Sequence, residues 1–294
     1  MWLVSATMRH LEGRVVVVTG SSRGIGYAVA AELVAQGARV VVNGRDEAVV
    51  DAAVEELVAD APGAAVGVAG SAAEPAVAQA LMDAAADLGG LTDLVACAGT
   101  AEPTGSSILT VTPEQWQDLI DAHLTSAFQV ARLAGPLLVE RGGGSIVLTG
   151  SHAFTGSYGG SGYPAAKGAT VSLGLAMAAE LREHGVRVNT VCPGARTRLS
   201  TGDDYEAQIE DLHRRGILDD LTRMGSLDPA GPEYVARLYA FLLSDLAADI
   251  TGQTYVGSGC FLGRFARPEA EMITWADHHT TPPLTLEQIA GHLA

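Results

Sequence analysis

The fold class of this 294-residue chain is decided by the stretch Val15-Val16-Val17-Val18-Thr19-Gly20-Ser21-Ser22-Arg23-Gly24-Ile25-Gly26. Its first part is a continuous β-branched run, which is typical of a strand buried on both faces of a parallel sheet. An Ala-rich helical segment, 26–36, follows directly and ends at Gly37. Glycines between a strand and a helix allow a tight turn and let a pyrophosphate approach the helix N-terminus. The stretch therefore predicts a nucleotide-binding βα unit, because its glycines stand at the first crossover.

Strands and helices continue to alternate along the chain. Six strands are predicted with helices between them, and a last strand follows near the C-terminus. The strands are expected at 15–19, 39–43, 65–69, 93–96, 145–149, 187–192 and 253–256, and the longest helices at 113–140 and 163–183. This order predicts an α/β fold with a Rossmann-type, doubly wound parallel sheet. We expect a single domain over 13–262, an N-terminal tail over 1–12 and a C-terminal tail over 263–294.

Composition and charge argue against several classes of protein. The net charge is −16, and Arg214-Arg215 is an isolated basic pair, so nucleic acid and anionic membranes are not expected partners. No apolar stretch reaches the length of about 18 residues that a membrane span needs. The first ten residues lack the basic and long apolar regions of a signal peptide. Three cysteines without metal-ligand spacing predict reduced thiols, no metal site and a cytoplasmic location.

Lys167 is the only lysine among 18 basic Lys and Arg residues. It follows Tyr163 by four residues, which places both side chains on one face of a predicted helix. Lys is a compact point charge, whereas Arg is a broad planar fork that keeps its proton. A cation beside a phenol lowers the phenol pKa. The pair therefore predicts a tyrosine that exchanges protons near neutral pH.

Thr-Gly-x-x-x-Gly-x-Gly over 19–26, followed by Tyr-x-x-x-Lys over 163–167, resembles the short-chain dehydrogenase/reductase family. The resemblance covers about residues 13–257 and implies hydride transfer between a nicotinamide and a carbonyl or alcohol carbon. In the family a Tyr moves the proton, a Lys binds the nicotinamide ribose and a Ser bonds the substrate oxygen. These roles fall on Tyr163, Lys167 and Ser151. The implied cofactor-binding residues are Gly20, Ser22, Arg23, Gly24, Ile25, Gly26, Asn43, Arg45, Ser71, Ala98, Gly99, Tyr163, Lys167, Pro193 and Gly194.

The end of the second strand bears on the choice of cofactor. NAD-dependent enzymes of this type place an Asp there for the ribose 2′-hydroxyl, but this chain reads Asn43-Gly44-Arg45. Arg45 and Arg23 can both reach a 2′-phosphate, so NADP(H) is expected and NAD is less favoured; the alternative is that Arg45 is a surface charge. Ser71 stands where the family usually has an Asp near the adenine.

Two catalytic positions depart from the family pattern. Ser151 lies one residue closer to Tyr163 than expected, which leaves Thr149 as an alternative partner of the substrate oxygen. His123 stands where the family has an Asn in the long helix. Either its imidazole helps to hold a water of the proton relay, or it is simply packed in a helix kink.

The histidine and the tail resemble one subgroup in particular. This is the 3-hydroxyacyl-CoA dehydrogenase domain of peroxisomal multifunctional enzymes and its bacterial relatives. Segments 252–259, 263–265 and 283–288 look like the extended C-terminus of that subgroup. The subgroup uses NAD, so its cofactor conflicts with Arg45, and the local residues carry more weight. No Lys/Arg cluster suits the phosphates of CoA, so the substrate is not assigned.

We therefore expect an NADP(H)-dependent carbonyl reductase or alcohol dehydrogenase. One alternative keeps the fold and cofactor for a non-redox step such as cyclisation, dehydration or isomerisation, and another is a nucleotide-binding regulatory protein. A charged insert, 197–229, fits a mobile lid over the substrate, with Ile209 and Leu212 on a narrow apolar stripe. The apolar tail is too rich in large residues to be disordered and should contain a helix over 285–293. In a homodimer or homotetramer, as the family implies, it would be buried on association.

Overall fold

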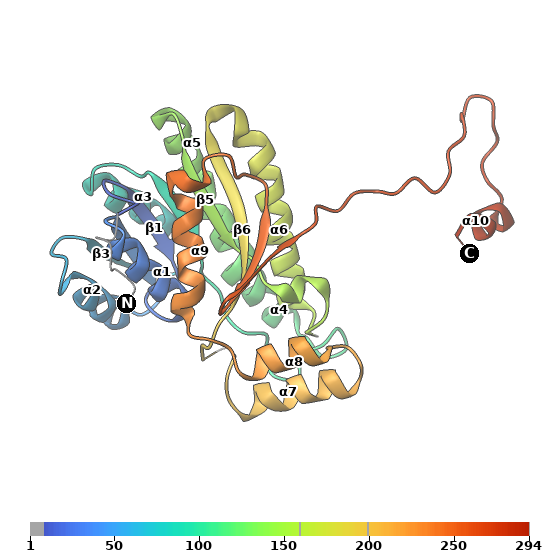
Figure 1. The fold of residues 1–294 in the computed structure, drawn as a ribbon, viewed down its shortest axis with the longest axis horizontal. Helices are drawn as coiled ribbons and strands as arrows, with labels where there is room; N and C mark the ends of the chain where they lie inside the picture. The colour runs from blue at the N-terminus through green and yellow to red at the C-terminus, as the bar shows by residue number, and fades with distance from the viewer. Residues whose placement is uncertain (1–8, 159, 199, 294) are drawn as a thin grey trace, which may run out of the picture.

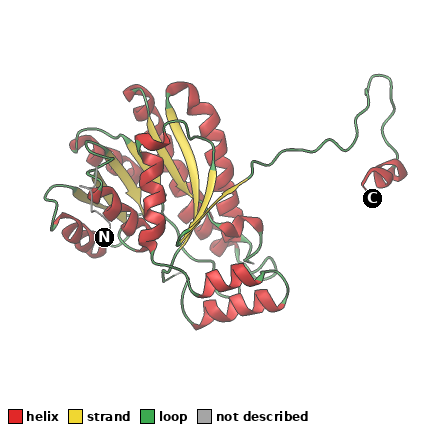
Figure 2. Ribbon diagram, in the orientation of Figure 1, coloured by secondary structure: helices red, strands yellow, loops and turns green. Residues whose placement is uncertain are grey.

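The computed structural model describes residues 9–158, 160–198 and 200–293, so residues 1–8 of the predicted N-terminal tail lie outside the described residues. The chain forms an eight-stranded sheet in the order β3-β2-β1-β4-β5-β6-β7-β8, and its strands are yellow in Figure 2. Strands β1 to β7 are parallel and β8 is antiparallel to β7. The predicted doubly wound α/β fold is confirmed.

The strands are β1 Val15–Thr19, β2 Arg39–Gly44, β3 Ala65–Ala69, β4 Asp93–Ala96, β5 Gly144–Thr149, β6 Val186–Gly194, β7 Thr254–Ser258 and β8 Phe261–Phe265. The helices are α1 Gly24–Ala35, α2 Glu47–Val58, α3 Pro75–Asp87, α4 Pro113–Ile120, α5 Ser126–Arg141, α6 Gly162–Leu181, α7 Asp203–Arg214, α8 Asp220–Leu227, α9 Pro232–Leu243 and α10 Leu286–Leu293.

Helices cover both faces of the sheet, as Figure 1 shows. The side chains of each central strand alternate between the two layers: Val16 and Val18 pack with α1 and α9, whereas Val15 and Val17 pack with the layer of α3, α5 and α6. This explains why β1 is apolar at every position, because a central parallel strand has no solvent face. Within the described ranges, no helix is long and apolar enough to cross a membrane.

The prediction of a single helix over 113–140 is wrong in one place. A π-helical turn, Asp121–Thr125, separates α4 from α5 and contains His123. Such turns insert a residue into the helical ladder and are frequent at functional sites. The turn reorients His123, which is 3% exposed, toward the loop after β4.

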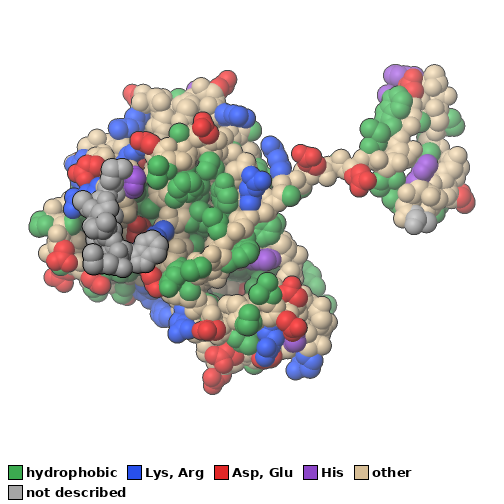
Figure 3. Space-filling model, viewed as in Figure 1, with side chains coloured by type: hydrophobic (Ala, Val, Ile, Leu, Met, Phe, Trp, Pro, Cys, Tyr) green, Lys and Arg blue, Asp and Glu red, His purple; other side chains and the backbone are tan. Residues whose placement is uncertain are grey.

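Strand β8 was not predicted. A two-residue turn at Gly259-Cys260 folds the chain back, so that Ser258 pairs with Phe261 and Thr254 with Phe265. Gly259 has a φ of +53°, which favours glycine. The tail then leaves β8 and extends away from the body, and α10 forms where the apolar spacing predicted a helix. Trp275 is 76% exposed in this single chain, and Figure 3 shows hydrophobic side chains at the far end of the projecting arm.

The insert between β6 and α9 folds as two helices, α7 and α8. Ile209 and Leu212 of α7 are buried against Leu218, as the apolar stripe predicted. Tyr158 and Tyr205 pack against this small cluster, and the Tyr158 hydroxyl hydrogen-bonds to the Ser226 hydroxyl at 3.0 Å. The insert is thereby joined to the segment between Ser151 and α6.

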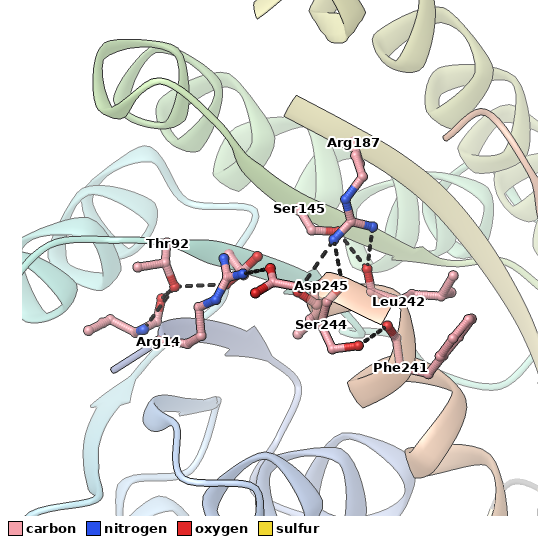
Figure 4. A network of polar contacts seen from close by, with 11 residues as sticks. Arg14, Thr92, Ser145, Arg187, Phe241, Leu242, Ser244 and Asp245 are labelled. Carbon is pink, nitrogen blue, oxygen red and sulfur yellow. Dashed lines mark hydrogen bonds and ion pairs between the residues drawn. The ribbon is translucent and has the colours of Figure 1, made fainter. Parts of the chain in front are cut away.

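A polar network joins β1, β4, β6 and α9 at the amino ends of the parallel strands (Figure 4). Arg14 lies 3.5 Å from the buried Asp93 carboxylate and donates to Asp245 at 2.5 Å. Arg187 donates to the carbonyls of Leu242, Leu243 and Ser244, at 2.6, 3.4 and 3.2 Å. These carbonyls end α9, so the guanidinium caps the negative end of that helix.

Candidate active site

The glycine-rich turn after β1 is shaped by close backbone approach. Gly20 has a φ of +65°, and a Cβ there would lie 2.7 Å from the Cα of Ala98. A Cβ at Gly26 would lie 2.3 Å from the carbonyl oxygen of Gly20. The Thr19 hydroxyl accepts from the backbone N–H groups of Cys97 and Ala98, at 3.0 and 3.1 Å. The turn and the loop after β4 therefore form one unit that only small residues allow.

The N-terminus of α1 fits a phosphate-bearing cofactor. Arg23 occupies the N-cap position in an extended conformation, and its side chain makes no capping hydrogen bond. The N-caps of α2 and α8, Asp46 and Asp219, do accept from their own first turns. Uncapped N–H groups at the positive end of a helix suit an anion, so Gly24, Ile25 and Gly26 can hold a pyrophosphate.

Close packing at the end of β2 leaves no room for an acidic residue at Gly44. A Cβ at Gly44 would lie 2.3 Å from Oγ of Ser22 and 2.7 Å from its Cβ. The carboxylate that reads a ribose 2′-hydroxyl has no room while Ser22 is present. Arg23 and Arg45 are both exposed at this end of the sheet, so two guanidinium groups are available to a 2′-phosphate.

Asn43, predicted to contact the cofactor, supports the turn through its side chain. It is 2% exposed, and its side-chain amide donates to the carbonyls of Val68 and Gly70 at 3.0 and 3.1 Å. Its Oδ1 accepts from Gly20 N–H at 3.3 Å. With both donors engaged, Asn43 links β2, β3 and the glycine turn. Ser71 lies next to Gly70, and its hydroxyl accepts from Ala73 N–H at 3.4 Å.

Ser151 and Tyr163 come together, and Thr149 does not compete with them. The Ser151 hydroxyl lies close enough to the Tyr163 phenol to lower its pKa. It also accepts from Ala153 N–H at 3.2 Å, which holds the short 3₁₀ turn that follows β5. The Thr149 hydroxyl is instead paired with the buried Tyr239 hydroxyl at 3.0 Å. The alternative that Thr149 faces the substrate is therefore not supported.

Lys167 lies beneath Tyr163 and is 4% exposed. Its Nζ is 5.8 Å from the Tyr163 ring centroid and donates to the Thr149 carbonyl at 2.7 Å. Burial lowers the Lys167 pKa to about 8, against the raising effect of Cys97 and Cys192. The ammonium thus keeps most of its charge at neutral pH.

The pKa of Tyr163 differs from the expectation of a lowered value. Burial raises it, and the hydrogen bond from Ser151 only partly opposes this effect. The ammonium of Lys167 is directed to the Thr149 carbonyl, so it does not offset the desolvation of the phenolate. Tyr163 is consequently protonated at neutral pH, the form that can donate a proton.

His123 meets Tyr163 edge-on, with ring centroids 4.9 Å apart and an interplanar angle of 88°. Its Nε2 lies 2.9 Å from the Thr100 carbonyl oxygen and 3.3 Å from the Thr100 nitrogen. Burial, reinforced by the charge of Lys167, lowers the His123 pKa to about 2, so the ring is neutral. Its buried Nδ1 has no hydrogen-bond partner among the described residues. The ring thus sits in a helix irregularity and has a buried polar atom without a partner among the described residues, and its role in holding a relay water stays a prediction.

Small residues also form the remaining edges of the site. A Cβ at Gly99 would lie 2.5 Å from Cε1 of His123, so the loop after β4 touches the imidazole directly. Pro193 and Gly194 end β6, and a Cβ at Gly194 would lie 2.7 Å from Oγ of Ser258. Burial raises the pKa of the Cys97 thiol, which replaces the family's Asn, and the nearby Thr149 side chain partly opposes this.

Two residues of this region were not predicted from the sequence. The backbone of Thr100 orients His123, and the carboxylate of Glu102 lies at the N-terminus of α6. Both act on residues more than 20 positions away, and Thr100 acts through its backbone, so no local motif marks them. A possible metal-ligand group among the described residues is Asp277, His278 and His279, exposed in the tail and outside this site.

Similarity to known proteins agrees with this geometry. Residues 20–260 match a family described as Enoyl-(Acyl carrier protein) reductase. The Mycobacterium tuberculosis hydroxyacyl-CoA dehydrogenase ChsB1 is 34% identical over 289 residues, covering 94% of this chain and 87% of the relative. The Vibrio cholerae 3-oxoacyl-[acyl-carrier-protein] reductase FabG is 33% identical, covering 86% of this chain and 99% of the relative.

The crystal structure of L-sorbose reductase from Gluconobacter frateurii, complexed with NADPH and L-sorbose, superposes with a TM-score of 0.73. The two chains are 27% identical, and the match covers 85% of this chain and 97% of the reductase. The chain belongs to the short-chain dehydrogenase/reductase family.

Proposed function

We propose that this protein is an NADP(H)-dependent oxidoreductase that transfers hydride between the nicotinamide and a carbonyl or secondary alcohol carbon. The observation that carries the proposal is the assembly of Tyr163 with the buried Lys167 ammonium, 5.8 Å from its ring, and with the Ser151 hydroxyl, which lowers the phenol pKa. This set lies at the carboxyl end of the parallel strands, the same end as the uncapped N-terminus of α1. Ligands of open α/β sheets bind at that end.

Tyr163 acts as the general acid and base. Because burial keeps its phenol protonated at neutral pH, it can donate a proton to a carbonyl oxygen as that oxygen gains charge. The Ser151 hydroxyl is near enough to the phenol to affect its pKa, so it is placed to hold the same substrate oxygen. The two groups together orient the oxygen for proton transfer.

Lys167 and His123 support the proton transfer. The Lys167 ammonium is fixed by the Thr149 carbonyl and can steady the phenolate that remains after Tyr163 gives up its proton. With its proton on Nε2, the neutral His123 ring donates to the Thr100 carbonyl at 2.9 Å, and Nδ1 is then an acceptor. A buried acceptor without a partner is a suitable place for a bound water. We assign His123 to holding a water that connects Tyr163 and Lys167 to solvent.

The cofactor would be held by the glycine turn, by Ala98 and Gly99 beside it, and by Pro193 and Gly194 across the sheet edge. When bound, NADP(H) supplies or accepts the hydride at nicotinamide C4. Arg23 and Arg45 would hold the 2′-phosphate, while the contact between Ser22 and Gly44 excludes the carboxylate that selects NAD. The NADPH complex of the related L-sorbose reductase supports this choice.

The substrate is proposed only as a small-molecule carbonyl compound or secondary alcohol. The relatives are named for hydroxyacyl-CoA, 3-oxoacyl-carrier-protein and L-sorbose, and these share a carbonyl/alcohol pair rather than a shape. Non-redox use of the fold is not favoured, because the relatives are dehydrogenases and reductases. A regulatory role is not favoured either, because Ser151, Tyr163 and Lys167 are assembled.

The remaining assignments are a cytoplasmic location, no nucleic-acid or membrane partner, and a homodimer or homotetramer in which the tail is covered. Support for the last comes from the tail itself, where Met272 and Trp275 are 78% and 76% exposed in the single chain. Domain limits of 13–262 and 263–294 are part of the proposal, with β8 bridging the boundary.

The proposed function is tested by incubating the protein with NADPH and a panel of ketones that includes β-ketoacyl thioesters and ketoses. We expect loss of absorbance at the reduced-nicotinamide band, with one equivalent of alcohol formed per NADPH consumed. NADH should support slower turnover. Product formation without consumption of NADPH would instead favour a non-redox reaction.

A further inference from the structure

Glu102 holds the N-terminus of the helix that carries Tyr163 and Lys167. Its carboxylate accepts hydrogen bonds from three consecutive backbone N–H groups: Ser161 at 3.3 Å, Gly162 at 3.4 Å and Tyr163 at 2.5 Å. It also accepts from the Ser106 hydroxyl at 2.7 Å. Glu102 lies 59 to 61 positions before these backbone groups, so the contact is entirely tertiary.

This carboxylate accounts for the N–H groups that α6 leaves without helical partners. Ser161, at the N-cap, makes no side-chain capping bond of its own. Pro164 has no N–H, and Ala165 N–H already reaches the Ser161 carbonyl at 3.2 Å. The donors left at the start of the helix are the three that Glu102 accepts from, and a negative charge at a helix N-terminus is favourable.

The surrounding backbone is shaped to fit this carboxylate. Gly160 has a φ of +74°, and a Cβ there would lie 2.8 Å from Cδ of Glu102. On the other side, Glu102 follows Thr100, whose backbone orients His123, by two residues. The loop after β4 therefore contacts the His123 imidazole through Thr100, and it contacts the N-terminus of α6, which carries Tyr163, through Glu102.

We propose that Glu102 is a positioning residue, which fixes Tyr163 relative to the loop that carries Ala98, Gly99 and the partner of His123. This inference rests on the proposed function for its effect on turnover. Without the carboxylate, the first turn of α6 loses its anchor, and the phenol can shift relative to both the substrate oxygen and the nicotinamide side of the site. A displacement of about 1 Å at a reacting group can cost about a hundredfold in rate.

The test compares Glu102→Ala and Glu102→Gln with Thr112→Ala. Thr112 accepts from Gln115 N–H at 3.2 Å and caps α4 at the far end of the same loop, so it controls for the loss of a helix cap. Glu102→Ala should lower kcat by about 10- to 100-fold. The Kd for NADPH should change by less than about threefold, because Glu102 is outside the glycine turn. Glu102→Gln keeps an acceptor oxygen and should recover part of kcat.

Hydrogen–deuterium exchange gives a readout that does not depend on turnover. In Glu102→Ala, peptides over 160–168 should exchange about tenfold faster or more, since a hydrogen bond to a charged group is lost. In Thr112→Ala, faster exchange should be confined to the start of α4. If the parent reduces no carbonyl, the proposed function fails, yet the exchange pattern still decides whether Glu102 holds Tyr163. Unchanged exchange over 160–168 in Glu102→Ala, or equal loss of kcat in Thr112→Ala, would overturn the proposal.

Discussion

The contact between Ser22 and Gly44 gives a sharp prediction about cofactor choice. Gly44→Asp introduces the carboxylate that reads a ribose 2′-hydroxyl, but its Cβ would lie 2.3 Å from Oγ of Ser22. Even an alanine at position 22 keeps a Cβ 2.7 Å away, so only Ser22→Gly makes room. We expect Gly44→Asp alone to lose stability by about 1–3 kcal/mol through overpacking and to gain little NADH binding.

The double variant Ser22→Gly/Gly44→Asp should bind NADH more tightly than either single variant. Arg45→Ala should separately weaken NADPH by about 10- to 150-fold, because a charge-assisted contact contributes about 1.5–3 kcal/mol. It should leave the Kd for NADH nearly unchanged, since NADH lacks the 2′-phosphate. Calorimetric titration of both cofactors with all four variants of the double-mutant cycle measures the coupling between positions 22 and 44.

Two results would refute this reasoning. One is additive behaviour in the cycle, with Gly44→Asp binding NADH equally well whether or not Ser22 is present. The other is an equal loss of NADH and NADPH binding in Arg45→Ala, which would make Arg45 a general structural charge. A matched control is Arg39→Ala, an exposed Arg at the opposite end of β2, which should alter neither Kd.

Three further predictions concern other parts of the molecule. Burial raises the pKa of Asp93 from 3.8 to about 7, so the folded state holds the proton more tightly and the free energy of unfolding should fall as pH rises from about 4 to about 7. That fall in the free energy of unfolding amounts to about 4 kcal/mol. Urea unfolding of Asp93→Asn should not show the fall, and an identical pH profile in the variant would mean that another group causes it. His123→Leu should lower kcat by about tenfold or more while His123→Asn retains most of it, because the Asn keeps a polar atom for the water; full activity in the Leu variant would make the ring purely structural. Truncation after Phe265 should change the oligomeric mass in light scattering, since the exposed apolar arm needs a cover; an unchanged mass and melting temperature would contradict this.

Much of the fold follows from local pattern. The β-branched run of β1 and the glycines after it identify a buried strand, a tight turn and a helix before any contact is known. Strand β8 escaped prediction because it is short, contains Gly263 and has exposed residues at Phe261 and Leu262. Its pairing depends on the turn at Gly259, because the register of a hairpin is set by its turn rather than by hydrophobic periodicity alone.

The candidate site, like the fold, was predicted from the sequence only in part. Ser151, Tyr163 and Lys167 were identified through motif spacing, and the structure brings them together. Asn43 stays a predicted cofactor residue, but its neighbours in sequence say nothing of the Val68 and Gly70 carbonyls that its amide meets. The direction of the Tyr163 pKa also depends on burial, which the four-residue spacing of the pair cannot convey.

The most direct test of the central claim is single-turnover reduction by the parent and by Tyr163→Phe, each saturated with NADPH. Removal of the hydroxyl keeps the aromatic ring of residue 163 against His123, and it keeps the Glu102 cap on α6. The affinity for the cofactor should therefore stay within about threefold. Loss of the general acid should lower the rate of hydride transfer by about 10²- to 10⁴-fold. A Tyr163→Phe protein that reduces a ketone within tenfold of the parent rate would show that the proton comes from another group, and the account would fail.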